Sequence, residues 1–178
     1  MVAALELYFD PHATRRIKVL WQAMEEAGVP SLAGLTHRRH RPHVSLAVAP
    51  ELDPHKVAAA LDGVSVAPPL TLTFDFVGQY LGRVVWLGPA PTAELLALHH
   101  TVYGRITEAG IAVSPQYHPG AWVPHCTLSM RVPAPKVPDA IRLCLDVLPI
   151  RATVTGAAVA DHNRGIYHPL PESRQREP

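Results

Sequence analysis

The feature that most constrains the fold is an internal repeat, in which the first half of the chain matches the second at a constant offset of 82 residues. Two segments with a helical pattern of apolar residues end in the same Glu-Ala-Gly triplet, at 26–28 and 108–110, where glycine suits a left-handed helix C-cap. A histidine follows each glycine by fifteen residues. Because one offset holds over helix, loop and strand, we expect a fold with two similar halves rather than chance identity.

The predicted elements recur in the same order in both halves. Short alternating or apolar runs predict strands, and apolar residues at helical spacing predict amphipathic helices. The expected strands are 5–9, 42–48, 70–77, 83–88, 122–130, 150–160 and a short 166–168, and the expected helices are 12–27, 54–61, 92–109 and 136–147. The sequence therefore predicts an α+β fold, a bilobal pseudo-two-fold duplication in which each lobe is a small, mostly antiparallel sheet with outer helices around a central groove. Residues 1–169 should form this single domain, and 170–178 a frayed tail.

Composition limits the partners. With 178 residues, 48% of them apolar, the chain has material for one core, and a net charge of +1 argues against a protein that coats extended duplex nucleic acid. Two cysteines, Cys126 and Cys144, are too few for a disulfide framework and favour a reducing compartment. No stretch approaches the roughly 20 apolar residues of a membrane helix, and no signal peptide is recognisable. We therefore expect a cytoplasmic monomer without a membrane partner.

The most similar short segment of the repeat is Pro-His-X-Ser/Thr-Leu, at 42–46 and 124–128. A single His-X-Ser/Thr would mean little in a chain with eleven histidines, so the information lies in the equivalent placement of the pair. Side chains alternate along a strand, so His43 and Ser45 should share one face, as should His125 and Thr127. If a pseudo-two-fold axis relates the halves, both pairs can face one groove.

Two imidazoles on opposite sides of one cavity suit an in-line displacement at phosphorus. A neutral imidazole can take the proton of the attacking hydroxyl or water while a protonated one gives a proton to the leaving oxygen, and both forms exist near neutral pH. No metal is required. The hydroxyls of Ser45 and Thr127 can donate hydrogen bonds to the non-bridging oxygens. Because the repeat makes His43 and His125 nearly interchangeable, the sequence leaves open which of them is the base.

The paired motifs resemble the His-X-Thr/Ser signature of the 2H phosphoesterase superfamily, which includes the 2'-5' RNA ligase and cyclic nucleotide phosphodiesterase families. The similarity covers residues 3–168. It implies a bilobal fold, chemistry without metal or other cofactor, and substrates with a 2',3'-cyclic phosphate or a 2'-5' linkage, with His43 and His125 catalytic and Ser45 and Thr127 binding phosphate. Many ligase-like members carry an arginine five residues after the second histidine. Met130 stands there in this chain, a departure that favours hydrolysis over ligation.

Residues outside the motifs are further candidates for phosphate binding, base stacking or metal binding. Arg41 closes the basic run 37–41, in phase with the first motif if the strand begins early, and is a candidate phosphate ligand, whereas Arg38 and Arg39 are expected on a solvated loop. Tyr117, in the loop before the second motif, is a candidate for stacking a nucleobase, worth ~1–3 kcal/mol. The remaining histidines show no recognised ligand spacing, so no metal site is expected. Cys126 should point away from the groove.

The sequence supports one leading hypothesis and two alternatives. The leading one is a metal-independent phosphodiesterase that opens 2',3'-cyclic phosphates of nucleotides or RNA ends by two-histidine acid/base catalysis. The near-neutral charge favours a small nucleotide or RNA end as substrate. The alternatives are 2'-5' RNA ligase or 2'-5' phosphodiesterase activity in the same groove, and a non-catalytic module that binds nucleotides or RNA ends.

Overall fold

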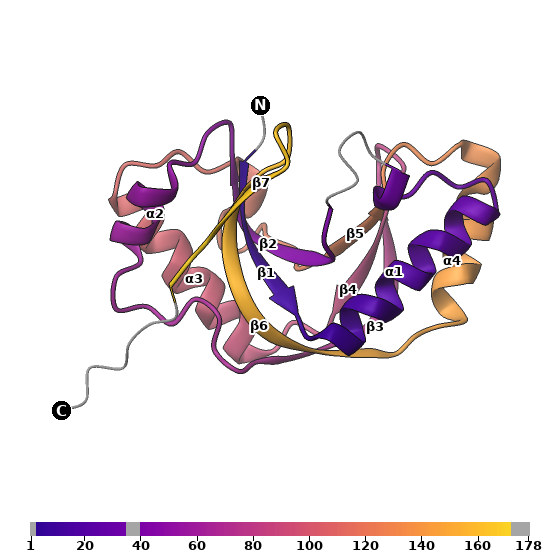
Figure 1. The fold of residues 1–178 in the computed structure, drawn as a ribbon, viewed down its shortest axis with the longest axis horizontal. Coiled ribbons are helices and arrows are strands. Elements are labelled where there is room, and N and C mark those ends of the chain that lie inside the picture. The colour runs from indigo at the N-terminus through magenta and orange to yellow at the C-terminus, as the bar shows by residue number, and fades with distance from the viewer. Residues whose placement is uncertain (1–2, 35–39, 172–178) are drawn as a thin grey trace.

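Seven antiparallel strands form the centre of the protein in a computed structural model that describes residues 3–34 and 40–171. The sheet order is β2-β1-β6-β3-β4-β5, and β7 also pairs with β6. The strands are β1 (Ala3–Phe9), β2 (His43–Ala49), β3 (Thr71–Tyr80), β4 (Val84–Pro89), β5 (Cys126–Ser129), β6 (Ile150–Asp161) and β7 (Ile166–Pro169). Figure 1 shows β6 sweeping from one side of the molecule to the other. The strands thus make one sheet rather than two clearly separate lobes, which corrects that part of the expected architecture.

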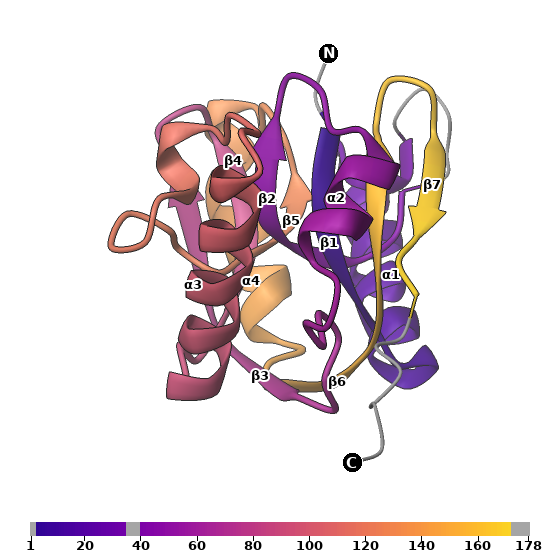
Figure 2. The ribbon, with the colours of Figure 1, turned by 90° about the vertical axis from the view of Figure 1, so that its left-hand side faces the viewer.

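Within the described residues, four α-helices cover the outside of this sheet in two pairs. They are α1 (Pro11–Glu26), α2 (Pro54–Ala60), α3 (Ala93–Glu108) and α4 (Val137–Leu145). Helix α1 packs on α4, and this pair contacts β6, β3 and β4, whereas α2 packs on α3, which contacts β2. Figure 1 shows the two pairs at opposite ends of the molecule, and Figure 2 views the molecule from the end that carries α2 and α3. The α+β class with an antiparallel sheet and outer helices is confirmed.

The strand register reproduces the sequence repeat as a symmetry. Thr71 of β3 pairs with Thr153 of β6, which is its own counterpart at the offset of 82 residues. A pseudo-two-fold axis therefore passes between these two threonines. Leu5 of β1 pairs with Val159 of β6, and the counterparts of these two residues pair with each other between β4 and β3. Each half of the chain thus pairs its first strand with the third strand of the other half.

The ends of α1 show how local sequence fixes the elements. One carboxylate oxygen of Asp10, the N-cap, accepts hydrogen bonds from two amides of the first turn, while the other accepts from the Thr153 amide at 2.7 Å. After the helix, Gly28 adopts φ +72°, and its repeat counterpart Gly110 adopts the same value, as expected for left-handed C-caps. The apolar stripe of α1 is buried, as its spacing predicts: Ile17, Leu20, Trp21 and Met24.

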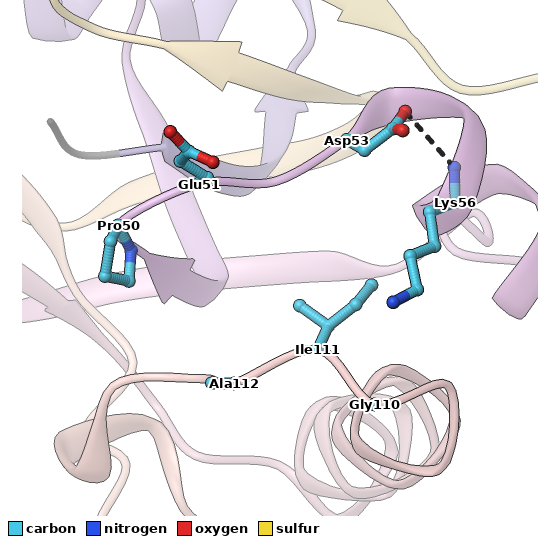
Figure 3. A pocket seen from close by; sticks show the side chains of 7 residues that line it. All are labelled: Pro50, Glu51, Asp53, Lys56, Gly110, Ile111 and Ala112. Carbon is cyan, nitrogen blue, oxygen red and sulfur yellow. Dashed lines mark hydrogen bonds between the residues drawn. The ribbon is translucent and has the colours of Figure 1, made fainter.

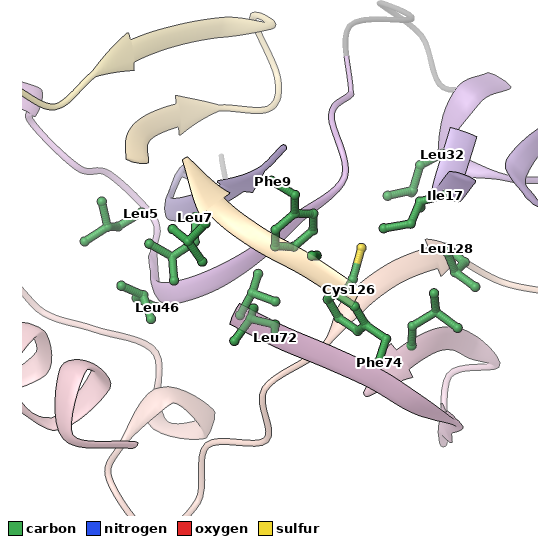
Figure 4. Close-up of a cluster of buried hydrophobic side chains, with 14 of the residues drawn as sticks. Leu5, Leu7, Phe9, Ile17, Leu32, Leu46, Leu72, Phe74, Cys126 and Leu128 are labelled. Atoms are coloured by element: carbon green, nitrogen blue, oxygen red, sulfur yellow. The ribbon is translucent and has the colours of Figure 1, made fainter. Parts of the chain in front are cut away.

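The core lies between the sheet and the helices, and it includes the apolar residues of both histidine motifs. Val44 and Leu46 of the first motif and Cys126 and Leu128 of the second are fully buried. Figure 4 shows Leu46, Cys126 and Leu128 within the buried cluster, together with side chains of β1, β3 and α1. Since side chains alternate along a strand, the hydroxyl residues of the two motifs lie on the opposite face of their strands from these core residues. The Cys126 thiol accordingly points into the core.

Two expected boundaries need correction. The strand expected at 122–130 is shorter, because β5 begins at Cys126, after Pro124, which has no amide hydrogen to donate to a sheet. The first motif strand begins at His43, so Arg41 lies outside it. Arg38, Arg39 and residues 172–178 lie outside the described residues. Both cysteines are unpaired and buried. Within the described ranges, we find no helix with the length and apolar character needed to span a membrane.

Candidate active site

The two motif histidines are held in the same way. Nδ1 of His43 lies 2.7 Å from the carbonyl oxygen of Arg41, and Nδ1 of His125 lies 2.8 Å from that of Val123. The two carbonyls are counterparts in the repeat. An Nδ1–H that donates to a carbonyl fixes the tautomer and the ring orientation, so each imidazole presents Nε2 for chemistry.

Contacts between the two motifs bring these imidazoles into one neighbourhood. The indole N–H of Trp122 donates to the carbonyl oxygen of Ser45 at 3.1 Å, and β2 contacts β5. Burial lowers the pKa of His125, and the nearby charge of His43 lowers this pKa further. The segments that carry the two histidines are therefore tied together, and the rings are near enough for their charges to interact.

A buried carboxylate beside His43 is the main feature that the sequence did not reveal. Glu6 of β1 has no exposed surface, and its Oε1 lies 3.2 Å from Nε2 of His43 and 2.6 Å from Nε2 of His162. Its Oε2 accepts a hydrogen bond from the Tyr8 hydroxyl at 2.6 Å. Burial alone would raise the pKa of Glu6, but His43, His162 and Tyr8 outweigh it, and the pKa is lowered. Glu6 is thus ionised inside this group of four residues, which we call the Glu6 cluster.

Register explains how the Glu6 cluster forms. Glu6 pairs with Ser45, and Tyr8 with His43, between β1 and β2, and directly opposed residues of paired strands point to the same face. His162 comes from the turn that follows β6, the other neighbour of β1.

Two further interactions border the Glu6 cluster. The His162 ring stacks on that of His43, with centroids 5.6 Å apart. Burial alone would lower the pKa of His162, but the hydrogen bond and the charge of Glu6 outweigh burial and raise this pKa. The guanidinium of Arg41 lies 4.1 Å from the centroid of the Tyr8 ring. Arg41 therefore stands at the edge of this cluster, although it is not in the strand.

The second half fills the equivalent positions differently. At the offset of 82 residues, the counterpart of Glu6 is Gly88 and that of His162 is Tyr80. The Tyr80 hydroxyl lies 3.3 Å from Nδ1 of His125, and the centroids of these two rings are 5.2 Å apart. The two halves thus repeat the backbone arrangement but differ in side chains. The carboxylate of Glu6 has no counterpart side chain at Gly88, and the imidazole of His162 is replaced by the phenol of Tyr80.

Aromatic rings surround His125. Trp86 lies 5.8 Å from the His125 ring and 5.2 Å from that of Tyr80, measured between centroids. A side chain at Gly78 would overlap the Trp86 ring, because an added Cβ would come within 2.2 Å of it. His125 therefore lies in a less polar setting than His43, which is the physical reason for the lowered pKa of His125.

The motif hydroxyls lie two residues beyond each histidine. Ser45 is buried, with 8% of its surface exposed. Thr127 of β5 pairs with Trp86 of β4 and is half-buried. Because paired residues share a face, Ser45 faces the same side as Glu6, and Thr127 the same side as Trp86.

The position of Tyr117 does not support the expected stacking role. The side chain is 8% exposed and belongs to the buried core, where burial raises its pKa to about 12. Its ring therefore has no open face for a nucleobase. Tyr80 is 36% exposed and lies beside His125, so it is the better-placed aromatic. No sequence signal distinguished the two, since both are single aromatic residues next to a predicted strand end or loop.

A separate hollow lies between the start of α2 and the end of α3. It is lined by Pro50, Glu51, Asp53, Lys56, Gly110, Ile111 and Ala112 (Figure 3). None of the motif residues takes part in it, so it is distinct from the site of the two histidines.

A duplicated antiparallel sheet with one His-X-Ser/Thr motif in each half defines the class of the 2H phosphoesterases. The chain belongs to the 2'-5' RNA ligase superfamily, whose family model matches residues 9–166. A search of curated protein sequences gives no match.

Solved structures agree with this assignment. The chain is similar to a phosphoesterase (24% identity, TM-score 0.62, covering 95% of this chain and 94% of the other) and to LigT of Escherichia coli in complex with NADP+ (24%, 0.61, 95% and 94%). It is also similar to Usb1 of Kluyveromyces marxianus with uridine monophosphate (9%, 0.52, 96% and 97%). At these identities the likeness establishes the fold.

Proposed function

We propose that this protein is a metal-independent phosphodiesterase that opens 2',3'-cyclic phosphates of nucleotides or RNA ends. The observation that carries the proposal is the equivalent orientation of His43 and His125, whose Nδ1 atoms each contact a backbone carbonyl while the two motifs are tied together. The nucleotides in the structures of similar proteins, NADP+, 3'-AMP and uridine monophosphate, support a small nucleotide or RNA end as partner.

The surroundings of the two histidines support different roles. Nδ1 of His43 faces a carbonyl and its Nε2 faces the ionised carboxylate of Glu6, so each nitrogen needs a proton to donate. These contacts, in which both ring nitrogens face acceptors, favour His43 as the general acid. Burial and the charge of His43 lower the pKa of His125, which favours a neutral ring and the role of general base.

In the proposed reaction, Nε2 of His125 takes a proton from water as the water oxygen attacks phosphorus. The bond from phosphorus to one ribose oxygen breaks in line, and Nε2 of His43 gives its proton to that oxygen. Ser45, Thr127 and Arg41 would bind the non-bridging oxygens, because the two hydroxyls lie two residues after the histidines and Arg41 borders the Glu6 cluster. The proton on His125 returns to His43 through solvent before the next turnover.

Hydrolysis of 2',3'-cyclic nucleotides in the presence of EDTA tests the activity. We expect turnover by the unchanged protein, and a loss of ~10²- to 10⁴-fold in kcat for His43→Ala and for His125→Ala. His55→Ala is the matched control, because His55 is exposed on α2 and distant from the motifs. Tight binding without turnover would favour the non-catalytic module, and preferential cleavage of 2'-5'-linked dinucleotides would favour the 2'-5' phosphodiesterase.

A substrate with a better leaving group tests the division of roles. A nitrophenyl ester of a nucleotide releases nitrophenolate, which needs little help from a general acid. His43→Ala should therefore lose far less activity on this ester than on the cyclic phosphate, whereas His125→Ala should lose activity on both. The opposite pattern would reverse the assignment of acid and base.

A further inference from the structure

The Glu6 cluster places three different ligand atoms around one point. One ligand atom from each of Glu6, His43 and His162 lies within 4.8 Å of those of the other two. The distance from Oε1 of Glu6 to Nε2 of His43 is 3.2 Å, and that to Nε2 of His162 is 2.6 Å. Ligands of a tetrahedral zinc ion at ~2.0–2.2 Å from the metal are about 3.3 Å apart. The distance from Glu6 to His43 already matches this ligand spacing, and the distance from Glu6 to His162 would have to lengthen by less than ~1 Å.

His43 and Glu6 have the supporting contacts that metal ligands need. A ligating histidine usually donates its other ring N–H to a carbonyl or a carboxylate, and Nδ1 of His43 lies 2.7 Å from the Arg41 carbonyl oxygen. A ligating carboxylate is usually hydrogen-bonded through its other oxygen, and Oε2 of Glu6 accepts from the Tyr8 hydroxyl at 2.6 Å. The Glu6 cluster thus contains both the atoms that would bind a metal ion and the hydrogen bonds that orient His43 and Glu6.

The donors also indicate which ions fit. Two imidazoles and one carboxylate suit borderline transition ions such as Zn²⁺ with a fourth position open, whereas Mg²⁺ and Ca²⁺ prefer sets made of oxygen. The side chains of His43 and His162 are 11% and 20% exposed, so an ion can reach the nitrogens from solvent although Glu6 is fully buried.

We propose that Glu6, His43 and His162 form a binding site for a divalent transition ion of the Zn²⁺ type, and that the bound ion inhibits the enzyme. The binding step stands on the geometry of the three ligands alone. The inhibition rests on the proposed function, because the ion occupies Nε2 of His43, the nitrogen that would give a proton to the leaving oxygen. The activity would then be sensitive to free zinc, although the turnover itself uses no metal.

Direct titration of the full-length, untagged protein with ZnCl₂ tests the site. We expect one equivalent to bind by calorimetry, MgCl₂ to give no heat of binding, and Co²⁺ to give the visible absorption of a four-coordinate ion. His162→Ala should weaken Zn²⁺ binding by more than the ~10-fold expected for Tyr8→Phe, which removes only an outer-shell contact. His55→Ala is the matched control and should bind as the unchanged protein does.

The outcomes separate the two proposals. Unchanged affinity in His162→Ala, or several weak sites of equal affinity instead of one, would overturn the metal site. Circular dichroism checks that each variant is folded, and a change at the half-buried His162 disturbs the core less than one at the fully buried Glu6. If the protein hydrolyses cyclic phosphates, Zn²⁺ should inhibit it, EDTA should restore the rate, and His162→Ala should need at least ~10-fold more Zn²⁺ for equal inhibition. If it does not hydrolyse them, the proposed function fails, while the Zn²⁺ titration still decides the site.

Discussion

At the scale of single residues, position 6 carries the chemical difference between the two halves. A buried carboxylate is costly unless it is paired and hydrogen-bonded, and Glu6 is surrounded by two imidazoles and a phenol. Its counterpart Gly88 has no side chain, and the Phe76 ring occupies that space, where an added Cβ would lie 2.0 Å from it. His43 thus lies beside the carboxylate of Glu6, whereas His125 lies among the aromatic rings of Tyr80 and Trp86.

Tyr80 should contribute to substrate binding more than to the chemical step. Because it offers an exposed ring beside His125, we expect Tyr80→Ala to raise KM about 5- to 150-fold, which corresponds to ~1–3 kcal/mol of lost stacking. Tyr80→Phe keeps the ring and should leave KM nearly unchanged. Steady-state kinetics on a 2',3'-cyclic nucleotide measure both, and a KM that Tyr80→Ala leaves unaltered would contradict the stacking role.

His99 should make stability depend on pH. It is 2% exposed in α3, its ring stacks on Trp122 with centroids 3.9 Å apart, and burial lowers its pKa to about 4 from 6.5. In the unfolded chain His99 takes up a proton as the pH falls below about 6.5, whereas in the folded protein it does so only near pH 4. Stability is therefore lost as the pH falls through this window, by up to ~1.4 kcal/mol per pH unit.

Urea unfolding at about pH 7 and about pH 5 measures this effect. His99→Gln removes the titrating group and should lose less stability between the two pH values than the unchanged protein. His55→Gln, at an exposed position, should behave like the unchanged protein. An equal pH dependence in all three proteins would show that His99 is not responsible.

Sequence reasoning reached only part of the candidate site. The paired motifs gave His43, Ser45, His125 and Thr127, because a repeat marks equivalent positions. Glu6, Tyr8 and His162 carry no local pattern, and they meet only because β1 lies between β2 and β6. The stacking role expected of Tyr117 fails for a similar reason. Its position in a loop does not reveal that its ring packs in the core.

At the scale of elements, the start of α1 is tied to the sheet as well as capped. Asp10 accepts from the amides of the first turn and also from Thr153 of β6, beside the pseudo-two-fold axis. Burial would raise the pKa of Asp10, but the hydrogen bonds from the Ala13, Thr153 and His12 amides outweigh it and lower the pKa. The cap thus fixes the angle at which α1 leaves β1.

Replacing this cap should cost more than replacing that of α2. Asp10→Ala should lower the free energy of unfolding by about 2 kcal/mol, because it removes an N-cap and a contact to β6. Asp53→Ala is the matched control, because Asp53 caps α2 through two amides without a strand partner, and it should cost about 1 kcal/mol. Urea denaturation of both variants gives the comparison, and an equal loss would mean that the link to β6 contributes little.

Most elements could be predicted from the sequence because their periods and caps are local. Helices α1 and α3 begin and end within one residue of the predicted 12–27 and 92–109. The start of β5 was misplaced because Pro124 interrupts the ladder in a run that otherwise alternates. The single sheet was missed as well, since which strands pair across the halves is a long-range property that no local pattern encodes.

At the scale of the whole molecule, the two halves are joined through exchanged strands. Residues 1–82 supply β3 to pair with β4, and residues 83–178 supply β6 to pair with β1. Either segment alone would leave β1 or β4 without that neighbour, and would expose apolar residues that the complete sheet covers.

Separating the chain in the turn before β4 tests this dependence. We expect segments 1–82 and 83–178, expressed apart, to give circular dichroism and NMR spectra of unfolded or aggregated chains, and their mixture to regain a folded spectrum. A folded spectrum from either segment as a monomer would show that the exchanged strands are dispensable.

The pairing of Thr71 with its own counterpart Thr153 has a consequence for the origin of this fold. A polypeptide of half this length could have assembled the same sheet as a symmetric homodimer, with two identical imidazoles in identical surroundings. Under that symmetry neither ring could have specialised, because a carboxylate acquired by one subunit would have appeared in both. A single chain that contains both halves is free of this constraint, and here glutamate and glycine stand at equivalent positions of the repeat.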